Sequence, residues 1–326
     1  MKAVSCLGVC IETHDSAEGI MDKIPETAAL PISDDVRLGT CKAKFRKILI
    51  GMDFSGPMVP PLNAAVSLAE KFGSTLFLVH AVPPVLYGPG ATPDLLDVDL
   101  DSARAQVDDI VSQVKMGSIH YRILVEFAEP TDLIDEVARA QAVDLIVVGS
   151  HGAHGLEKLA FGSVAESVLR RVLCPVLVLG PHCKKNLASI QSIVFATDLE
   201  IGAFRPAQYA SSIAEEMNAR LTLLHVRKPG LKVDEVSPEI LENRLAGTLR
   251  QLLPADAELW CQPKIRVEAG NASEEVLRVA ESESADLIVV GVREKSTLAD
   301  HSPWSTLSHI IRGANCPVLG VRGHLI

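Results

Sequence analysis

Residues 144–180 read DLIVVGSHGAHGLEKLAFGSVAESVLRRVLCPVLVLG, and both ends of this stretch occur a second time in the chain. The string DLIVVG spans Asp144–Gly149 and returns at Asp286–Gly291, while CPVL begins at Cys174 and returns at Cys316, so each string recurs 142 positions later. Both are short apolar runs beside glycine, proline or a charge, a pattern typical of buried strands in a parallel sheet. The repeat predicts two copies of one α/β unit.

The length and composition fit a globular protein with two domains. The chain has 326 residues, 48% hydrophobic and 22% charged, which suits two domains of about 140 residues each. The formal net charge of −10 argues against a basic nucleic-acid-binding surface, although backbone N–H groups can still hold a single nucleotide. The sequence contains no run of about 18 consecutive apolar residues, which a membrane-spanning helix would require. We expect a cytoplasmic protein with no nucleic-acid or membrane partner.

The seven cysteines are scattered and include no C-x-x-C pair. An odd number without paired spacing predicts neither a disulfide framework nor a zinc site. Cys174 and Cys316 each open an apolar run, so we expect them to be small buried residues.

Strands and helices alternate throughout both copies. Residues 1–43 lie outside the repeat and form an N-terminal extension, the first domain spans 44–181, and the second spans 189–326 after a short linker. In the first domain we expect strands at 47–53, 75–82, 119–126, 144–149 and 174–180, and helices at 63–72, 97–116, 131–140 and 162–173, with Thr131 as a helix cap. In the second we expect strands at 192–198, 221–226, 264–270, 286–291 and 316–321, and helices at 205–218, 236–252, 273–282 and 305–314.

Five short apolar strands separated by helices predict a doubly wound parallel sheet, covered on both faces, in each domain. Asp53 and His80 are 27 positions apart, as are Asp198 and His225, so the two copies keep the same spacing. The final strands, near 176–179 and 318–321, are natural edges that pair with each other or with a second chain. We expect a pseudo-symmetric pair of domains within one chain, as a monomer or as a homodimer through edge strands.

A glycine motif follows the DLIVVG strand of the first copy. It reads Gly149-x₂-Gly152-x₉-Gly162-Ser163. Glycines let the backbone turn and approach an anion without a Cβ in the way, and a helix amino end with unpaired N–H groups favours phosphate. The motif therefore predicts a phosphate site between a strand and a helix, to which Ser163 adds a hydroxyl donor.

Together with DLIVVG and CPVL, this motif resembles that of the universal stress protein family, whose nucleotide-binding members carry G-2x-G-9x-G-(S/T) at this place. The resemblance covers about residues 45–325 as two tandem copies. It implies an adenine nucleotide alpha hydrolase-like fold with strand order 3-2-1-4-5. It also implies that ATP, with Mg²⁺, binds at the carboxyl ends of strands one and four, the switch point where such sheets bind ligands.

The resemblance assigns binding roles to seven residues. Asp53 matches the acid that contacts the nucleoside, and Ala81 matches the position whose backbone meets the adenine. The phosphate set is Gly149, Gly152, Gly162, Ser163 and Val164. Ala165 departs from the members that carry Ser or Thr there, which removes at most one contact.

Two of these assignments, Asp53 and Gly149, have a structural alternative. Asp53 alone is equally compatible with capping the following helix, and Gly149 with a turn that needs positive φ. His151 and His154 form H-x-x-H without further ligands nearby, so we expect no metal there. His80 and His225 occupy equivalent strand ends, which indicates a role in the fold.

The second copy lacks the phosphate motif. Aligned on Gly291, it places Glu294 where the first copy has Gly152 and Trp304 where it has Gly162. A carboxylate repels phosphate and a tryptophan fills the helix entrance, so we expect no ATP bound in the same way. Asp198 and Val226 still match the nucleoside side, and the second copy is interpreted as a structural partner.

The leading hypothesis is an ATP-binding regulator or sensor in stress response, with one nucleotide site in the first domain. The chain shows no Walker lysine, nucleophile elbow or metal triad, so we assign no catalytic residues and do not expect an enzyme. The alternatives are an interaction scaffold that binds no nucleotide, a slow ATPase, and an enzyme or electron carrier on a related fold. The sequence does not identify a protein partner.

Overall fold

The computed structural model describes residues 44–323, except residues 55, 85–92, 151–161, 186, 201, 229–236, 256, 258–260 and 293–301. The extension at 1–43 lies outside the described residues. So do four residues discussed above: His151, Gly152, His154 and Glu294.

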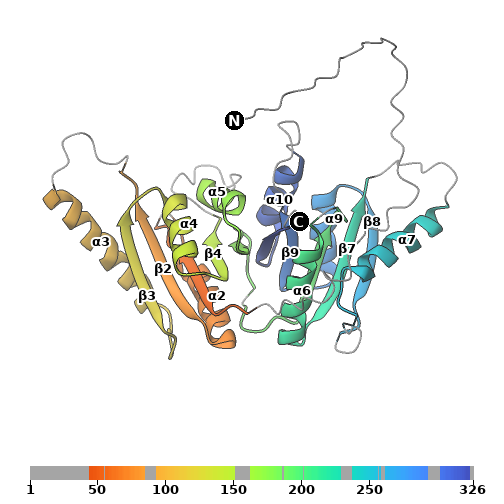
Figure 1. The fold of residues 1–326 in the computed structure, drawn as a ribbon, viewed down its shortest axis with the longest axis horizontal. Helices are drawn as coiled ribbons and strands as arrows, with labels where there is room; N and C mark the ends of the chain where they lie inside the picture. The colour runs from red at the N-terminus through yellow and green to blue at the C-terminus, as the bar shows by residue number, and fades with distance from the viewer. Residues whose placement is uncertain are drawn as a thin grey trace, which may run out of the picture.

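Strands and helices alternate in both halves of the chain (Figure 1). The first half comprises β1 (Lys47–Gly51), α2 (Val59–Phe72), β2 (Thr75–Val82), α3 (Pro93–Ser112), β3 (Tyr121–Phe127), α4 (Pro130–Ala140), β4 (Leu145–Gly149), α5 (Ser163–Arg171) and β5 (Val176–Leu179). The second comprises β6 (Ser192–Thr197), α6 (Phe204–Met217), β7 (Arg220–Arg227), α7 (Pro238–Gln251), β8 (Lys264–Ala269), α9 (Ala272–Ser282), β9 (Leu287–Val292), α10 (Ser302–Gly313) and β10 (Val318–Arg322).

Three helices of the first half begin earlier than the sequence pattern predicts, each at or beside a proline. Helix α2 begins at Val59, α3 at Pro93 and α4 at Pro130. Proline is tolerated there because the N–H groups of the first turn have no partner within the helix. Thr131 as a cap is therefore wrong: the N-cap of α4 is Glu129, and no side chain caps that helix.

The described strands form one ten-stranded sheet in the order β3-β2-β1-β4-β5-β10-β9-β6-β7-β8. Neighbouring strands are parallel within each half. Each half thus has the predicted order 3-2-1-4-5, and the predicted α/β fold is confirmed.

The two halves join through their last strands, β5 and β10, which pair antiparallel. In this register Leu177 lies opposite Leu319, and Val176 lies opposite Gly320. Leu177 and Leu319 are themselves 142 positions apart, so a pseudo-twofold axis runs between them. The pairing of the two final strands with each other is confirmed.

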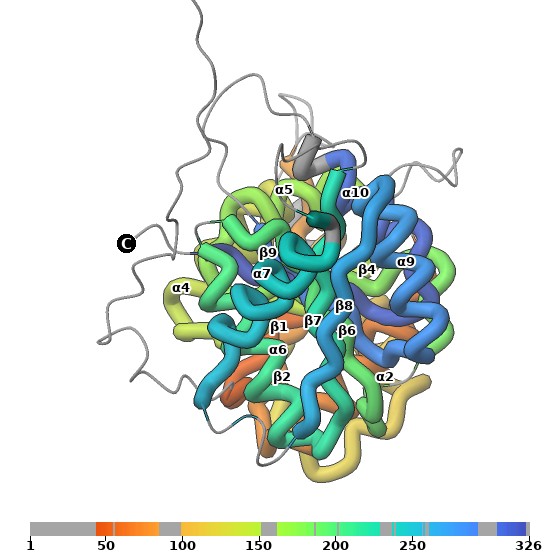
Figure 2. The backbone as a smooth tube through the Cα atoms, turned by 90° about the vertical axis from the view of Figure 1, so that its right-hand side faces the viewer, coloured from red at the N-terminus to blue at the C-terminus, as the bar shows by residue number. Residues whose placement is uncertain are grey.

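Helices cover both faces of the sheet, and each face has its own apolar core. Helices α2, α3, α6 and α7 pack over one face, and α4, α5, α9 and α10 over the other. Figure 2 shows the second half end-on, with α6 and α7 on one side of the strands and α9 and α10 on the other. Both cores include residues of both halves, so the halves share their interior.

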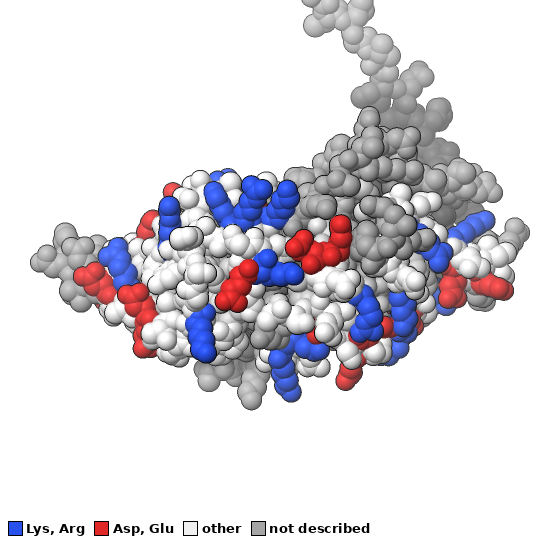
Figure 3. Space-filling view, turned by 90° about the horizontal axis from the view of Figure 1, so that it is seen from below, with Lys and Arg blue, Asp and Glu red and all other residues white. Residues whose placement is uncertain are grey.

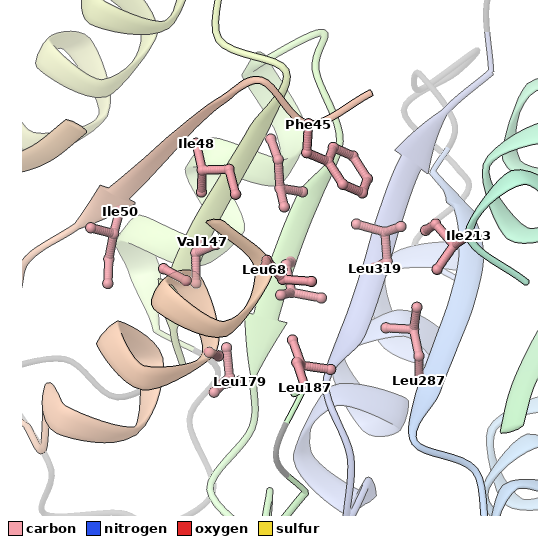
Figure 4. Packing of buried hydrophobic residues seen from close by; sticks show 14 of the residues in the cluster. Phe45, Ile48, Ile50, Leu68, Val147, Leu179, Leu187, Ile213, Leu287 and Leu319 are labelled. Atoms are coloured by element: carbon pink, nitrogen blue, oxygen red, sulfur yellow. The ribbon is translucent and has the colours of Figure 1, made fainter. Parts of the chain in front are cut away.

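The core at the junction is closely packed (Figure 4). Phe45 and Leu68 of the first half meet Ile213, Leu287 and Leu319 of the second, around a residual void of only about 10 Å³. Such packing leaves little room for the two halves to move against each other.

The aspartate that opens each DLIVVG string anchors the first strand of its half. The Oδ2 atom of Asp144 accepts hydrogen bonds from the N–H groups of Arg46 and Lys47, both at 2.9 Å. Asp286 accepts two such bonds at the start of β6, at 2.9 and 3.1 Å. The repeated aspartate is therefore explained by backbone hydrogen bonds of the fold.

Gly180 provides a test of the junction. A Cβ at this position would lie 2.1 Å from the carbonyl oxygen of Ile311, so Gly180→Ala forces the two halves apart. We expect it to lower the free energy of unfolding by about 1–3 kcal/mol, the usual cost of overpacking.

The matched control is Gly247→Ala. Gly247 lies in α7, and a Cβ there meets nothing within 4 Å. We expect this change to raise the free energy of unfolding by about 0.5–1 kcal/mol, because alanine replaces glycine within a helix. Urea unfolding measures both variants, and equal effects would contradict the described junction.

Candidate functional site

A cavity of about 630 Å³ opens in the first half, at the carboxyl ends of β1, β2 and β4. It is lined by six of the seven residues singled out from the sequence, namely Asp53, Ala81, Gly149, Gly162, Ser163 and Val164. The seventh, Gly152, lies outside the described residues. Residues far apart in the chain thus meet at one place, the switch point of the sheet.

The phosphate part of the motif surrounds the amino end of α5. Gly162 is the N-cap, and Ser163 and Val164 begin the first turn. The N–H of Gly162 donates to the carbonyl oxygen of Ser150 at 3.0 Å, which ties the start of α5 to the end of β4. Because the N-cap residue is glycine, it has no side chain to occupy the N–H groups of the first turn.

Asp53 follows β1 and lines the same cavity. The alternative that it caps the next helix is wrong, because Met58 is the N-cap of α2 and no side chain caps that helix. The loop is instead fixed by the Asp53 N–H, which lies 3.4 Å from the Sδ atom of Met58.

Gly149 does not adopt the positive φ that the sequence alternative required. A Cβ at Gly149 would lie 3.5 Å from Pro61, and one at Gly291 would lie 3.5 Å from Pro206. Backbone strain therefore does not explain Gly149. Its place in the cavity wall leaves the backbone accessible, as close approach of a ligand requires.

Two aromatic rings that were not predicted as site residues form part of the cavity wall. The rings of Phe54 and His80 stack with centroids 4.1 Å apart, and both residues line the cavity. The Nδ1 atom of His80 lies 2.8 Å from the carbonyl oxygen of Met52. A carbonyl only accepts, so Nδ1 carries the proton and Nε2 of the neutral ring is an acceptor.

His80 and His225 share one role in the fold. Like His80, His225 places Nδ1 near the carbonyl oxygen at the end of the first strand of its half, Thr197, at 3.0 Å. Burial lowers the pKa of His80 below 6.5, and the hydrogen bond to Met52 and the charge of Asp53 oppose this shift only in part. His80 is therefore neutral at physiological pH.

In the second half, the segments equivalent to those around Pro57 and Pro181 of the first half contact each other. A Cβ at Gly323 would lie 2.6 Å from the carbonyl oxygen of Gly202, so the loop before α6 packs against the end of β10. The equivalent residues of the first half, Pro57 and Pro181, both line the cavity. The two halves therefore differ at a second place besides the glycine motif, and this difference was not predicted from the sequence.

The retained nucleoside-side residues of the second half serve local structure. Oδ1 of Asp198 accepts a hydrogen bond from the N–H of Glu200 at 3.1 Å, and Val226 lies in β7. Trp304 falls within α10, but its side chain is not described. The role of Glu294 also stays a prediction, because that residue lies outside the described residues.

Of the two cysteines that open the CPVL strings, Cys316 is buried as predicted, whereas Cys174 is only half-buried. Burial raises the pKa of Cys174 and Cys316 to about 12, so neither forms a thiolate near neutral pH. Cys183, in the linker, lines the cavity, a placement with no signal in the sequence.

Three further features concern metal ligands, membrane spans and surface charge. Within the described ranges, no group of three or more His, Cys, Asp or Glu side chains could hold a metal ion. No helix in this part of the chain is long and apolar enough to cross a membrane. The face seen from below in Figure 1 intersperses Lys and Arg with Asp and Glu (Figure 3), unlike the continuous basic surface that binds nucleic-acid backbones.

Comparison with known proteins gives a consistent result. The model of the universal stress protein family matches residues 44–180 and again residues 189–322. A universal stress protein A homolog of Coxiella burnetii is 34% identical over 139 residues, which are 41% of this chain and 93% of the relative. A universal stress protein of Mycobacterium tuberculosis is 25% identical over 306 residues, 85% of this chain and 97% of the relative.

Among solved structures, a universal stress protein from Archaeoglobus fulgidus is similar with a TM-score of 0.65 and 19% identity. The similarity covers 86% of this chain and 97% of that protein. At this identity, the structural similarity supports the two-domain fold.

The lowered pKa of His80 predicts a pH-dependent stability. As the pH falls below 6.5, unfolded chains take up the proton before the folded chain does, so the folded state loses stability. We expect the free energy of unfolding to fall less in His80→Asn than in the wild type between about pH 7.5 and about pH 5.5. Urea unfolding at both pH values measures this, and equal losses in the two proteins would contradict a buried neutral His80.

Proposed function

Because this chain belongs to the universal stress protein family, we propose that its first domain binds one molecule of ATP and acts as a nucleotide-dependent regulator or sensor. One observation carries the proposal. Asp53, Ala81 and the helix start at Gly162–Ser163 line a single cavity, although more than a hundred positions separate the first of them from the last.

The cavity suits a nucleotide in size and in the distribution of its groups. Its volume of about 630 Å³ falls within the range of roughly 300–1,000 Å³ typical of ligand pockets. The apolar wall near Ala81, with Phe54 and His80, suits a purine base and ribose. The carboxylate of Asp53 can accept hydrogen bonds from ribose hydroxyls.

The phosphates would meet the start of α5. The free N–H groups of the first turn and the positive end of the helix dipole favour anions, and the Ser163 hydroxyl adds a donor. Gly149, beside this helix start, lines the same cavity without a Cβ. The residues proposed for the base and those proposed for the phosphates thus line one cavity, as a bound nucleotide requires.

Mg²⁺ would accompany the nucleotide. Magnesium is usually held by phosphate oxygens, waters and one or two carboxylates, with no need for a cage of protein ligands. Asp53 is the carboxylate of the predicted set that lines the cavity. We therefore propose that Mg²⁺ arrives with ATP and does not occupy a site of its own.

Nucleotide content tests the proposal directly. The purified protein is denatured, and the supernatant is analysed for nucleotide. We expect about one equivalent of ATP per chain, and at least a tenfold weaker retention in Asp53→Asn, since hydrogen bonds to charged groups typically contribute about 1.5–3 kcal/mol. Asp198→Asn, the matched change in the second half, should leave the content unchanged.

A second variant, Gly152→Glu, gives the first copy the residue found at Glu294 and should abolish ATP binding. Two equivalents of ATP would contradict the single site. Absence of nucleotide, with no thermal shift on adding ATP, would favour an interaction scaffold. Turnover of ATP that disappears in Asp53→Asn would instead indicate a slow ATPase.

A further inference from the structure

Helix α5, whose amino end meets the proposed phosphate site, is held at its other end by the second domain. The last carbonyl groups of a helix have no partner within it. The guanidinium of Arg322 donates to the carbonyl oxygens of Arg170 and Arg171, the latter at 3.5 Å. Arg322 is the last residue of β10, so these donors come from the other half of the chain.

A second arginine extends this contact. Arg205, near the start of α6, donates through Nη1 to the carbonyl oxygen of Leu173 at 3.2 Å, just beyond α5. The same group donates to the carbonyl oxygen of Arg322 at 2.7 Å, and it lies 5.5 Å from the ring centre of Tyr209. The two arginines therefore form one connected group on the second domain.

The body of α5 also rests on the second domain. A Cβ at Gly320 of β10 would lie 2.6 Å from Cδ2 of Leu169, so the glycine makes room for this leucine. Leu169 is buried. Leu169 and the carboxyl end of α5 thus contact the second domain. Arg171 also ties the helix to Asp132 and Asp135 of α4.

The first copy has no such arginines. At the positions equivalent to Arg205 and Arg322 it carries Pro60 and Gly180, and both of these line the cavity. The carbonyl oxygen of Ile311, near the end of α10, packs against Gly180. The arginine pair therefore distinguishes the second copy and acts on the helix of the first.

We propose that Arg205 and Arg322 are positioning residues for the nucleotide site of the first domain, an inference that rests on the proposed function. They hold the carboxyl end of α5, and their positive charges lie where the helix dipole is negative. The amino end of this helix of nine residues is thereby fixed where the phosphates would bind. The second domain contributes to the site without touching the ligand.

The test compares ATP with adenosine in the full chain by isothermal titration calorimetry. Adenosine has the base and ribose but no phosphates, so a displaced α5 affects ATP alone. We expect Arg322→Met to weaken ATP binding about tenfold, at the low end of the roughly 10–100-fold losses seen when outer-shell partners are removed at metal sites, and to leave adenosine binding unchanged. Arg322→Lys keeps the charge but loses the guanidinium fork, and it should give an intermediate loss.

Arg278→Met is the matched control, because Arg278 lies on α9 and pairs with Glu268 and Glu275. It removes the same charge away from α5 and should change neither affinity. If Arg322→Met is unfolded at the assay temperature, the affinities for ATP and adenosine are compared in Arg322→Lys and Arg205→Lys instead.

The possible results separate the two proposals. Wild-type protein that binds no ATP would overturn the proposed function, and this inference with it. Wild-type protein that binds ATP, with equal affinity in the Arg322 variants, would overturn the positioning role alone. Equal loss of ATP and adenosine binding would also overturn it, because it would indicate a general loss of structure.

Discussion

The antiparallel pairing of β5 with β10 is the interaction on which the rest of the structure depends. Unpaired, each final strand would expose a row of apolar side chains and backbone hydrogen-bonding groups at a sheet edge. Paired, they make one sheet of ten strands and bring the two apolar cores of each half together. The only strand edges left in the described sheet are β3 and β8.

Across this pairing, equivalent residues of the two copies make different contacts. Pseudo-symmetry places equivalent residues on opposite sides of the junction, where residues of each copy contact the other copy. Pro57 and Pro181 line a cavity while Gly202 and Gly323 touch. Gly180 admits a carbonyl of the second half, while its counterpart Arg322 binds carbonyls of the first. These differences leave one half with the cavity and give the other the groups that support it.

The strands and the equivalence of the two copies could be predicted from the sequence, because apolar runs and repeat spacing are local sequence signals. The apolar runs predicted all ten strands, and the repeat predicted that Leu177 and Leu319 lie in equivalent strands. The early starts of α2, α3 and α4 were not predicted, although the first turn of a helix accepts the prolines found there. The contacts of Arg205 and Arg322 were not predictable, since they join segments through the antiparallel register and involve carbonyl oxygens, which no residue type reveals.

The central claim is that one half of a pseudo-symmetric chain holds the nucleotide site. Hydrogen–deuterium exchange of the full chain with and without ATP tests it most directly, because amide protection reports each half separately. We expect added protection in peptides covering 51–58 and 162–171, and none in the equivalent peptides 196–203 and 304–313. Equal protection in both sets, or none in either, would contradict it.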